Sequence, residues 1–182
     1  MQTRNRKRLQ LVLIASLFFV PMVVSALLVA SGWVPGARSN GEGIVPQRSF
    51  DDIAVTLADG APLAWRDPDW RWTVVAVPGR GCGDACIKQL DRIHRARIAL
   101  NQKAARVRLV YVGTPPTGEA GATVMQAWQV GTDVAGRLSE WAPDTDDGVA
   151  AVLVKPDGTA LTVYRNGFDA SGLRKDLAKV TK

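Results

Sequence analysis

A run of 22 residues without a single charge, at positions 9–30, limits the architectures open to this chain. At about 1.5 Å of rise per residue, a helix of this length spans the ~30 Å hydrocarbon layer of a bilayer. Positions 1–8 carry four basic residues, namely Arg4, Arg6, Lys7 and Arg8. Because basic residues gather on the cytoplasmic side of a membrane, we expect residues 1–8 to be a cytoplasmic flank and residues 9–30 a single-pass transmembrane helix.

This orientation predicts an inner (cytoplasmic) membrane protein whose soluble domain lies in the periplasm. A cleaved signal peptide is the alternative for the same segment, although its apolar region usually has only ~7–15 residues and ends at a small-x-small site. The run in this chain is longer, and no clean Ala-x-Ala sequence follows it. The sequence therefore favours an uncleaved anchor.

The basic charge of the chain is concentrated in front of this apolar run. The net charge is +6, from 23 basic and 17 acidic residues, but four of the basic residues belong to positions 1–8. The remainder, 19 basic against 17 acidic residues, has no polyelectrolyte character, and an exported domain rarely meets nucleic acid. We therefore expect no nucleic-acid partner.

The rest of the chain divides into a linker and one domain. Residues 31–48 are rich in Gly, Pro, Ser and Asn, so they have too little apolar surface to fold alone and are predicted to form a flexible tether. Residues 49–182 have the size of a single domain with one core.

Apolar runs bounded by Pro and Gly predict strands in this domain, and apolar residues at helical spacing predict helices. The order of these elements is a βαβ unit followed by a hairpin and a covering helix, which predicts an α/β domain with a central mixed sheet and helices on both faces. The expected strands are residues 72–77, 107–112, 149–154 and 161–164, preceded by a short hairpin at 53–65. The expected helices are residues 83–103, 123–130, 134–141 and 171–179, the last with Ser171 as its N-cap.

The chain contains only two cysteines, Cys82 and Cys86, and both stand where the first buried strand passes into a helix. The free backbone amides and the dipole of a helix N-terminus stabilise a thiolate, and the nearby charges of Arg80 and Lys88 act in the same direction. Glycines at 79, 81 and 83 should leave Cys82 exposed, while Cys86 faces inward one turn later. We therefore predict a redox-active pair in which Cys82 attacks and Cys86 resolves.

A disulfide that only staples the domain is the alternative for this pair, since exported proteins commonly contain oxidised cysteines. Closing so short a loop removes little entropy from the unfolded chain. The short spacing therefore favours redox or metal chemistry, with a structural disulfide as the second hypothesis.

A strand, a Cys-x-x-x-Cys pair at a helix start, and a later strand, Pro-Asp-Gly turn and strand together resemble the Sco/SenC family over about residues 50–180. These are thioredoxin-like, membrane-anchored copper chaperones and thiol reductases that assemble the CuA site of cytochrome c oxidase. The resemblance implies a thioredoxin-like fold, a possible copper cofactor, and a respiratory partner such as an oxidase subunit or another copper or thiol chaperone. A non-enzymatic assembly protein on the same scaffold is the alternative function.

In that family both cysteines bind copper together with a histidine nine residues before the proline of the later hairpin. Counting back from Pro156 gives Asp147, so the resemblance implies Cys82 and Cys86 as Cu(I) ligands with Asp147 in the third position. Cu(I) prefers sulfur and imidazole, whereas carboxylates suit harder ions. His94, the only histidine, is expected on a helix face. The copper site is therefore expected to be incomplete.

Two further groups of residues invite a functional interpretation. Asp144, Asp146 and Asp147 could bind a hard cation, although a solvated loop is the simpler interpretation. The tryptophans at 65, 70 and 72 could form a binding surface, but their position around a strand start favours packing at the sheet edge.

Overall fold

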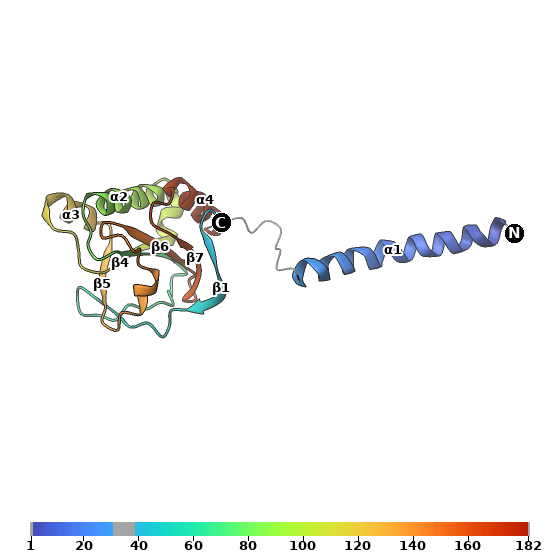
Figure 1. Ribbon diagram of the computed structural model, residues 1–182, viewed down its shortest axis with the longest axis horizontal. Helices are drawn as coiled ribbons and strands as arrows, with labels where there is room; N and C mark the ends of the chain where they lie inside the picture. Colours follow the sequence, from blue (N-terminus) through green and yellow to red (C-terminus); the bar gives the residue numbers. More distant parts are fainter. Residues whose placement is uncertain (1, 31–38, 182) are drawn as a thin grey trace. The chain divides into compact units, whose positions relative to one another are not determined.

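A computed structural model describes residues 2–30 and 39–181 of the chain, which forms two compact units, Met1–Arg38 and Ser39–Lys182. In the first unit, helix α1 (Gln2–Ala30) contains Pro21 and includes residues 9–30, for which a helix was expected (Figure 1). Among the described parts of the chain, which for the side chains of α1 are residues 13–28, no helix is both long and apolar enough to cross a membrane. Residues 31–38 of the predicted linker lie outside the described residues.

The second unit is built on a mixed sheet of seven strands, counted over residues 39–181 and ordered β1-β7-β6-β3-β4-β5-β2. Strand β3 is central, parallel to β4 and antiparallel to β6, and its burial on both faces follows from its continuous apolar sequence. The bounds are β1 (Glu42–Ser49), β2 (Val55–Leu57), β3 (Trp72–Pro78), β4 (Val107–Val112), β5 (Gln129–Asp133), β6 (Val149–Val154) and β7 (Thr159–Tyr164).

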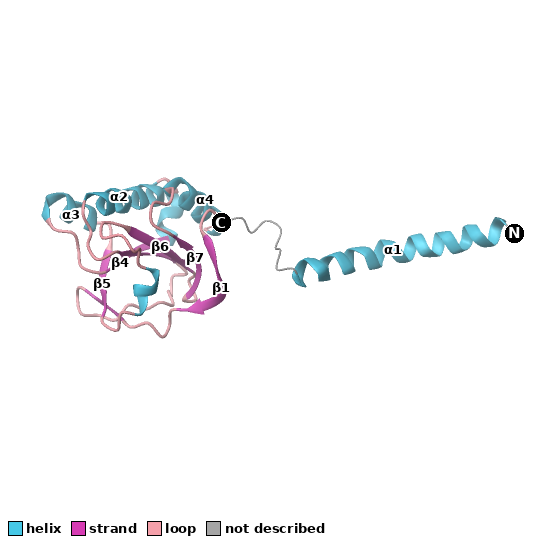
Figure 2. Ribbon diagram, viewed as in Figure 1, coloured by secondary structure: helices cyan, strands magenta, loops and turns pink. Residues whose placement is uncertain are grey.

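The two faces of the sheet are covered differently (Figure 2). One face carries α2 (Asp84–Ile98), α3 (Gly118–Met125) and α4 (Ala170–Val180), with Leu90 and Leu173 among the side chains that close this half of the core. The other face is closed by the 3₁₀ helix η2 (Arg137–Trp141) and by irregular segments that bury Phe50 and Trp65. The expectation of helices on both faces is therefore wrong for the second face, where residues 134–141 supply only one short turn.

Two predicted boundaries differ from the structure. Residues 42–48, assigned to the linker, belong to edge strand β1, which pairs with β7 and buries Ile44. Pro46 is tolerated because an edge strand leaves one row of amides unpaired. Residues 129–133, assigned partly to a helix, form β5, in which Gly131 lets Val55 of β2 approach closely. Pairing across the sheet outweighs the local sequence signal at both places, which indicated a linker at residues 42–48 and the end of a helix at residues 129–130.

The predicted helix at residues 83–103 ends early, and the last helix has a different cap. After α2, Asn101 takes a positive φ of 54° and begins the 3₁₀ helix η1 (Asn101–Arg106). In α4, the N-cap is Asp169, whose carboxylate accepts a hydrogen bond from the amide of Ser171, so Ser171 is not the cap.

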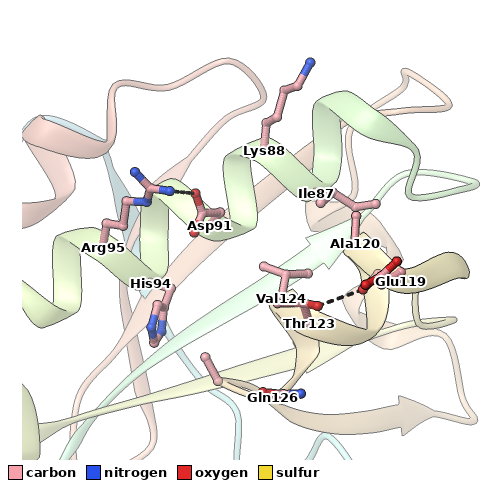
Figure 3. A pocket seen from close by; sticks show the side chains of 11 residues that line it. Ile87, Lys88, Asp91, His94, Arg95, Glu119, Ala120, Thr123, Val124 and Gln126 are labelled. Carbon is pink, nitrogen blue, oxygen red and sulfur yellow. Dashed lines mark hydrogen bonds and ion pairs between the residues drawn. The ribbon is translucent and has the colours of Figure 1, made fainter.

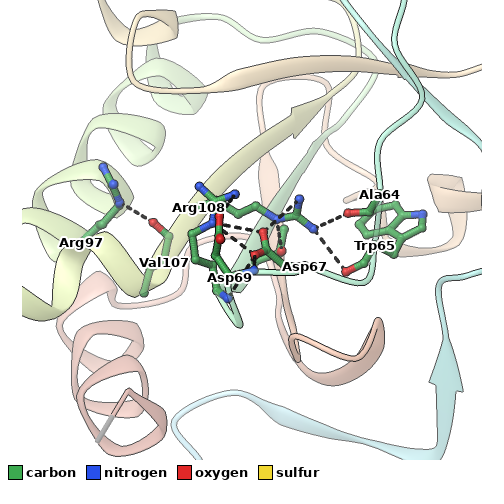
Figure 4. Close-up of polar contacts among 9 residues, drawn as sticks. Ala64, Trp65, Asp67, Asp69, Arg97, Val107 and Arg108 are labelled. Atoms are coloured by element: carbon green, nitrogen blue, oxygen red, sulfur yellow. Dashed lines mark hydrogen bonds and ion pairs between the residues drawn. The ribbon is translucent and has the colours of Figure 1, made fainter.

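A buried ion cluster fastens the segment before β3 to the neighbouring strand (Figure 4). The Asp67 side chain, only 1% exposed, lies 3.1 Å from Arg71 and 3.5 Å from Arg108 of β4. The Arg108 guanidinium also donates to Thr73 Oγ1 and to the carbonyl of Ala64. Strand β3 and the segment before it therefore satisfy most of the hydrogen-bond donors of the buried Arg108 guanidinium.

A second buried carboxylate fastens the first described residues of the domain to its last helix. Asp176 of α4 accepts hydrogen bonds from Ser39, from the backbone and side-chain amides of Asn40, and from the Tyr164 hydroxyl. Burial raises the pKa of Asp176, but these hydrogen bonds outweigh it and hold the pKa below its ordinary value. The start of the domain is thus tied to its carboxyl-terminal helix.

Candidate functional site

The two cysteines lie at the carboxyl end of the central strand, where β3 passes into α2. Cys82 lies in the loop, two residues before the helix, and Cys86 lies in the first turn of α2. They form a disulfide with their Cα atoms 5.1 Å apart. Because Cys82 precedes the helix, the disulfide joins the loop to the first turn of α2.

The two sulfur-bearing residues differ in exposure. Cys86 is completely buried and packs in the core between the sheet and the helices, together with Leu90. Cys82 is half-buried and packs on the edge of the same core. Cys82 is therefore the more accessible residue of the pair, while Cys86 is shielded.

Asp147, which precedes β6, is brought directly to the cysteine pair. Its carboxylate accepts hydrogen bonds from the backbone amides of Gly83, Ala85 and Cys86, at 2.7, 3.0 and 3.1 Å. The amides of Ala85, Cys86 and Gly83, together with the nearby charge of Lys88, hold the pKa of Asp147 below its ordinary value. Asp147 is therefore a charged cap, supplied from another part of the chain, on the N-terminus of α2.

The glycines around Cys82 serve this contact. A Cβ atom on Gly79 would lie 2.0 Å from the carbonyl oxygen of Thr145, and one on Gly83 would lie 3.0 Å from the Asp147 carboxylate. The amides of Gly79 and Gly81 also donate to the carbonyls of Gly148 and Asp146. The glycines thus allow residues 145–148 to lie against the cysteine loop, a role that the sequence did not reveal.

The positive charges expected to favour a thiolate are largely compensated. Arg80 forms an exposed ion pair with Asp146 at 2.8 Å, and Lys88 faces Asp147. The amides of the α2 N-terminus, the other source of positive potential, already bind Asp147. The environment of the pair is therefore less positive than the sequence indicated.

A groove of about 570 Å³ borders the cysteine loop. It is lined by residues at the carboxyl ends of β3 and β4 and by η2, among them Pro78, Gly81, Pro115 and Leu138. Backbone from Gly79 and Gly113 also lines it. This surface is mixed in polarity and reaches the cysteine loop at Gly79, Arg80 and Gly81, directly before Cys82.

The donor set fits only part of a Cu(I) site. The reduced cysteines would supply two sulfur ligands, but Asp147 is a hard ligand whose two oxygens already accept three amides. Within the described residues, no group of three or more His, Cys, Asp or Glu side chains is arranged to hold a metal ion. The acidic cluster gives no cation site either, because Asp146 and Asp147 are engaged by Arg80 and by α2.

The single histidine lies outside this site. His94 stands two turns after Cys86 on α2 and lines a separate cavity of about 830 Å³ between α2 and α3. In Figure 3 its ring lies beside the side chains of Asp91 and Arg95, which pair with each other, with Thr123 of α3 across the cavity. Its Nδ1 atom is buried without a hydrogen-bond partner in the described structure.

The tryptophans are divided between core and surface. Trp65 is buried, stacks edge to face on Phe50 and donates to the carbonyl of Ile53, which agrees with a packing role. Trp70 is 72% exposed and has a positive φ of 54°. Arg66 and Arg71 bind Asp51 and Asp67, so the group does not form one continuous binding surface.

Comparison with known proteins identifies the architecture. Residues 72–182 match the family described as "Transmembrane-like, thioredoxin-like, C-terminal domain". A search of curated proteins by sequence finds no match.

Solved structures with the same fold include two Sco1 proteins and a protein assigned as a thiol:disulfide interchange protein. Apo Sco1 from Thermus thermophilus has a TM-score of 0.58 at 15% identity, covering 81% of this chain and 99% of its own. Copper-bound yeast Sco1 has a TM-score of 0.53 at 11% identity, covering 80% and 94%. A protein assigned as DsbE from Chlorobium tepidum has a TM-score of 0.51 at 16% identity, covering 78% and 97%. At these identities the likeness establishes the thioredoxin-like fold.

Proposed function

Because the chain belongs to the family of transmembrane-like, thioredoxin-like C-terminal domains, we propose that it is a membrane-anchored thiol–disulfide accessory protein of respiratory cytochrome c oxidase (CuA) assembly. The observation that carries the proposal is the disulfide between half-buried Cys82 and fully buried Cys86 at the β3–α2 junction. The oxidase as the destination is supported by the resemblance to Sco proteins, in fold and in the Cys-x-x-x-Cys motif.

The proposed reaction transfers two electrons from the reduced pair to a partner disulfide. The Cys82 thiolate attacks one partner sulfur, which forms a mixed disulfide and releases the other partner sulfur as a thiolate. Cys86 then attacks Cys82, which reforms the disulfide of the structure and releases the second partner thiol. A dithiol donor reduces the pair again. The groove beside the loop would hold the partner segment during these steps.

Copper delivery is the second function that the resemblance implies, and no specific observation favours it over thiol exchange. The two thiolates would provide sulfur ligands for Cu(I), but the position of the family's histidine is held by Asp147, which caps α2. We therefore assign the reducing role to the pair and derive no step through copper.

In the full-length chain, we expect Cys86→Ser to accumulate a mixed disulfide with a peptide disulfide, because Cys82 still attacks but cannot be resolved. The matched variant Cys82→Ser should form none, since Cys86 is buried. Mass spectrometry of the acid-quenched protein measures the adduct. The wild-type pair should equilibrate with glutathione at a potential above about −300 mV.

The opposite result would favour the alternative, a non-enzymatic assembly or interaction protein with a structural disulfide. A potential below about −300 mV, together with no alkylation of Cys82 after reduction, is the behaviour of a structural disulfide. Either cysteine variant forming the adduct equally well would also contradict the assigned roles.

We further propose that residues 9–30 anchor the protein in the inner membrane with the domain in the periplasm, on the strength of their apolar sequence and basic flank. The full chain should stay in the membrane fraction after an alkaline carbonate wash, whereas a chain without residues 1–38 should be released. The intact mass should include residues 9–30. A shorter mature chain in the soluble fraction would instead identify a cleaved signal peptide.

A further inference from the structure

We propose that Asp147 sets the redox equilibrium of the cysteine pair, making the disulfide harder to reduce and the reduced pair a stronger reductant. This inference rests on the proposed thiol–disulfide exchange and gives Asp147 a positioning role. It acts through α2 and forms no bond to the partner.

The equilibrium between the disulfide and the reduced cysteines depends on the backbone amides at the start of α2. A helix N-terminus stabilises a nearby thiolate through its unpaired amides and its dipole. Stabilising the reduced form makes a disulfide more oxidising. A pair in this position with free amides would therefore be readily reduced and would be a poor donor of electrons.

Asp147 removes this stabilisation of the thiolate by the helix N-terminus. Its carboxylate accepts hydrogen bonds from the amides of Gly83, Ala85 and Cys86, the groups nearest the pair. Its negative charge also destabilises a cysteine thiolate nearby, whereas it has no such effect on the neutral disulfide. Both effects favour the disulfide over the reduced pair.

The structure provides no other acceptor for this helix start among the described residues. The N-cap residue is Gly83, which has no side chain and makes no side-chain cap. Arg80 does not offset the carboxylate, because Arg80 is paired with Asp146. Lys88 is the remaining nearby cation, and it is on the solvent side of α2.

The test compares two variants of Asp147 with one neighbouring control, in the full-length chain in detergent. Asp147→Asn removes the charge and keeps an acceptor oxygen, and Asp147→Ala removes both. Asp146→Asn removes the negative charge of the adjacent residue, which pairs with Arg80; the α2 amides at Gly83, Ala85 and Cys86 donate to Asp147 instead. The measurement is the equilibrium between oxidised and reduced pair in glutathione buffers.

We expect both Asp147 variants to shift this equilibrium about tenfold toward the reduced pair, which corresponds to about +30 mV for a two-electron couple. Asp146→Asn should change it less than about twofold, since exposed charges are screened. Reduced Cys82 should also be alkylated faster at neutral pH in Asp147→Asn than in wild type, because more of it is thiolate.

A purely structural cap would behave differently. It would lower the melting temperature of Asp147→Ala and leave the potential of the well-folded Asp147→Asn at the wild-type value, and that outcome would overturn the inference. An equal shift in Asp146→Asn would also overturn it. Failure of the proposed function is a separate result, because it appears in the wild-type potential and in the alkylation of Cys82, without any variant.

Discussion

Asp67→Ala is expected to lower the free energy of unfolding by about 3–5 kcal/mol, the usual effect of removing one partner from a buried ion pair. The Asp67 side chain is 1% exposed and the Arg108 side chain 11% exposed, so the variant leaves a buried guanidinium without its counter-charge. The amides of Asp69 and Arg71 lose their acceptor as well. Urea unfolding of the full chain, followed by tryptophan fluorescence, measures the change.

The matched control is Asp51→Ala, which breaks an ion pair of the same residue types in the same part of the chain. Arg66 in that pair is 75% exposed, so the loss of stability should be much smaller than in Asp67→Ala. Equal destabilisation by the two variants would contradict the prediction that burial makes the Asp67 ion pairs important for stability.

The effect of Asp67 should also depend on pH. Burial raises the pKa of Asp67, but hydrogen bonds from Arg71 and the charge of Arg108 outweigh it and hold the pKa below its usual value of 3.8. A carboxylate with a lowered pKa contributes its full stability above that value and loses it as the pH falls through the folded-state pKa. The difference in unfolding free energy between wild type and variant should therefore be constant near neutrality and narrow as the pH falls below 3.8 and through the folded-state pKa.

Asp176→Asn is expected to cost about 2–4 kcal/mol, since it places an amide where five hydrogen-bond donors, from Ser39, Asn40, Tyr164 and Lys179, meet a buried carboxylate. The side-chain oxygen of the variant can take the Oδ2 place, where Ser39, the Asn40 backbone amide and Tyr164 donate. Its NH₂ group then stands at the Oδ1 place and faces two donors, the Asn40 side-chain amide and the Lys179 ammonium, which lose this acceptor. Residues 39–41 should then detach locally. Hydrogen exchange at Asn40 and Gly41 should become faster, with little change in β3.

Tyr164→Phe serves as the comparison for Asp176, because it removes one neutral donor from the same carboxylate. Burial raises the pKa of Tyr164, so the phenol remains a donor, and its removal should cost only about 1 kcal/mol. If Asp176→Asn left both stability and exchange at Asn40 unchanged, the tie between the domain's start and α4 would have no energetic role.

The strands that could be predicted from the sequence are those whose own residues carry a clear pattern. Strands β4 and β6 were predicted to the residue, because each is an unbroken apolar run between turn residues, and such runs are buried on both faces of a sheet. Strands β1 and β5 were missed. Their sequences contain Pro and Gly and are only partly buried, so they become strands through pairing with β7 and β4.

The cysteine pair was found from the sequence, but its surroundings were not. The spacing placed Cys82 and Cys86 at a strand–helix junction, and the family pattern pointed to Asp147 as their neighbour. Its contacts with the α2 amides depend on how two distant loops pack. Gly83 at the helix start was the available signal, because a helix whose N-cap has no side chain needs an acceptor from elsewhere.

The order of the strands has a mechanical consequence. A force applied at Ser39 would act first on the hydrogen bonds of Ser39 and Asn40 to Asp176. It would act next on β1, which lies at the sheet edge and pairs with β7. Strand β3 lies three positions further into the sheet. The cysteine pair is thus separated from the β1 edge of the sheet by β7 and β6, so losing the pairs of β1 would leave the contacts of the loop around Cys82 in place.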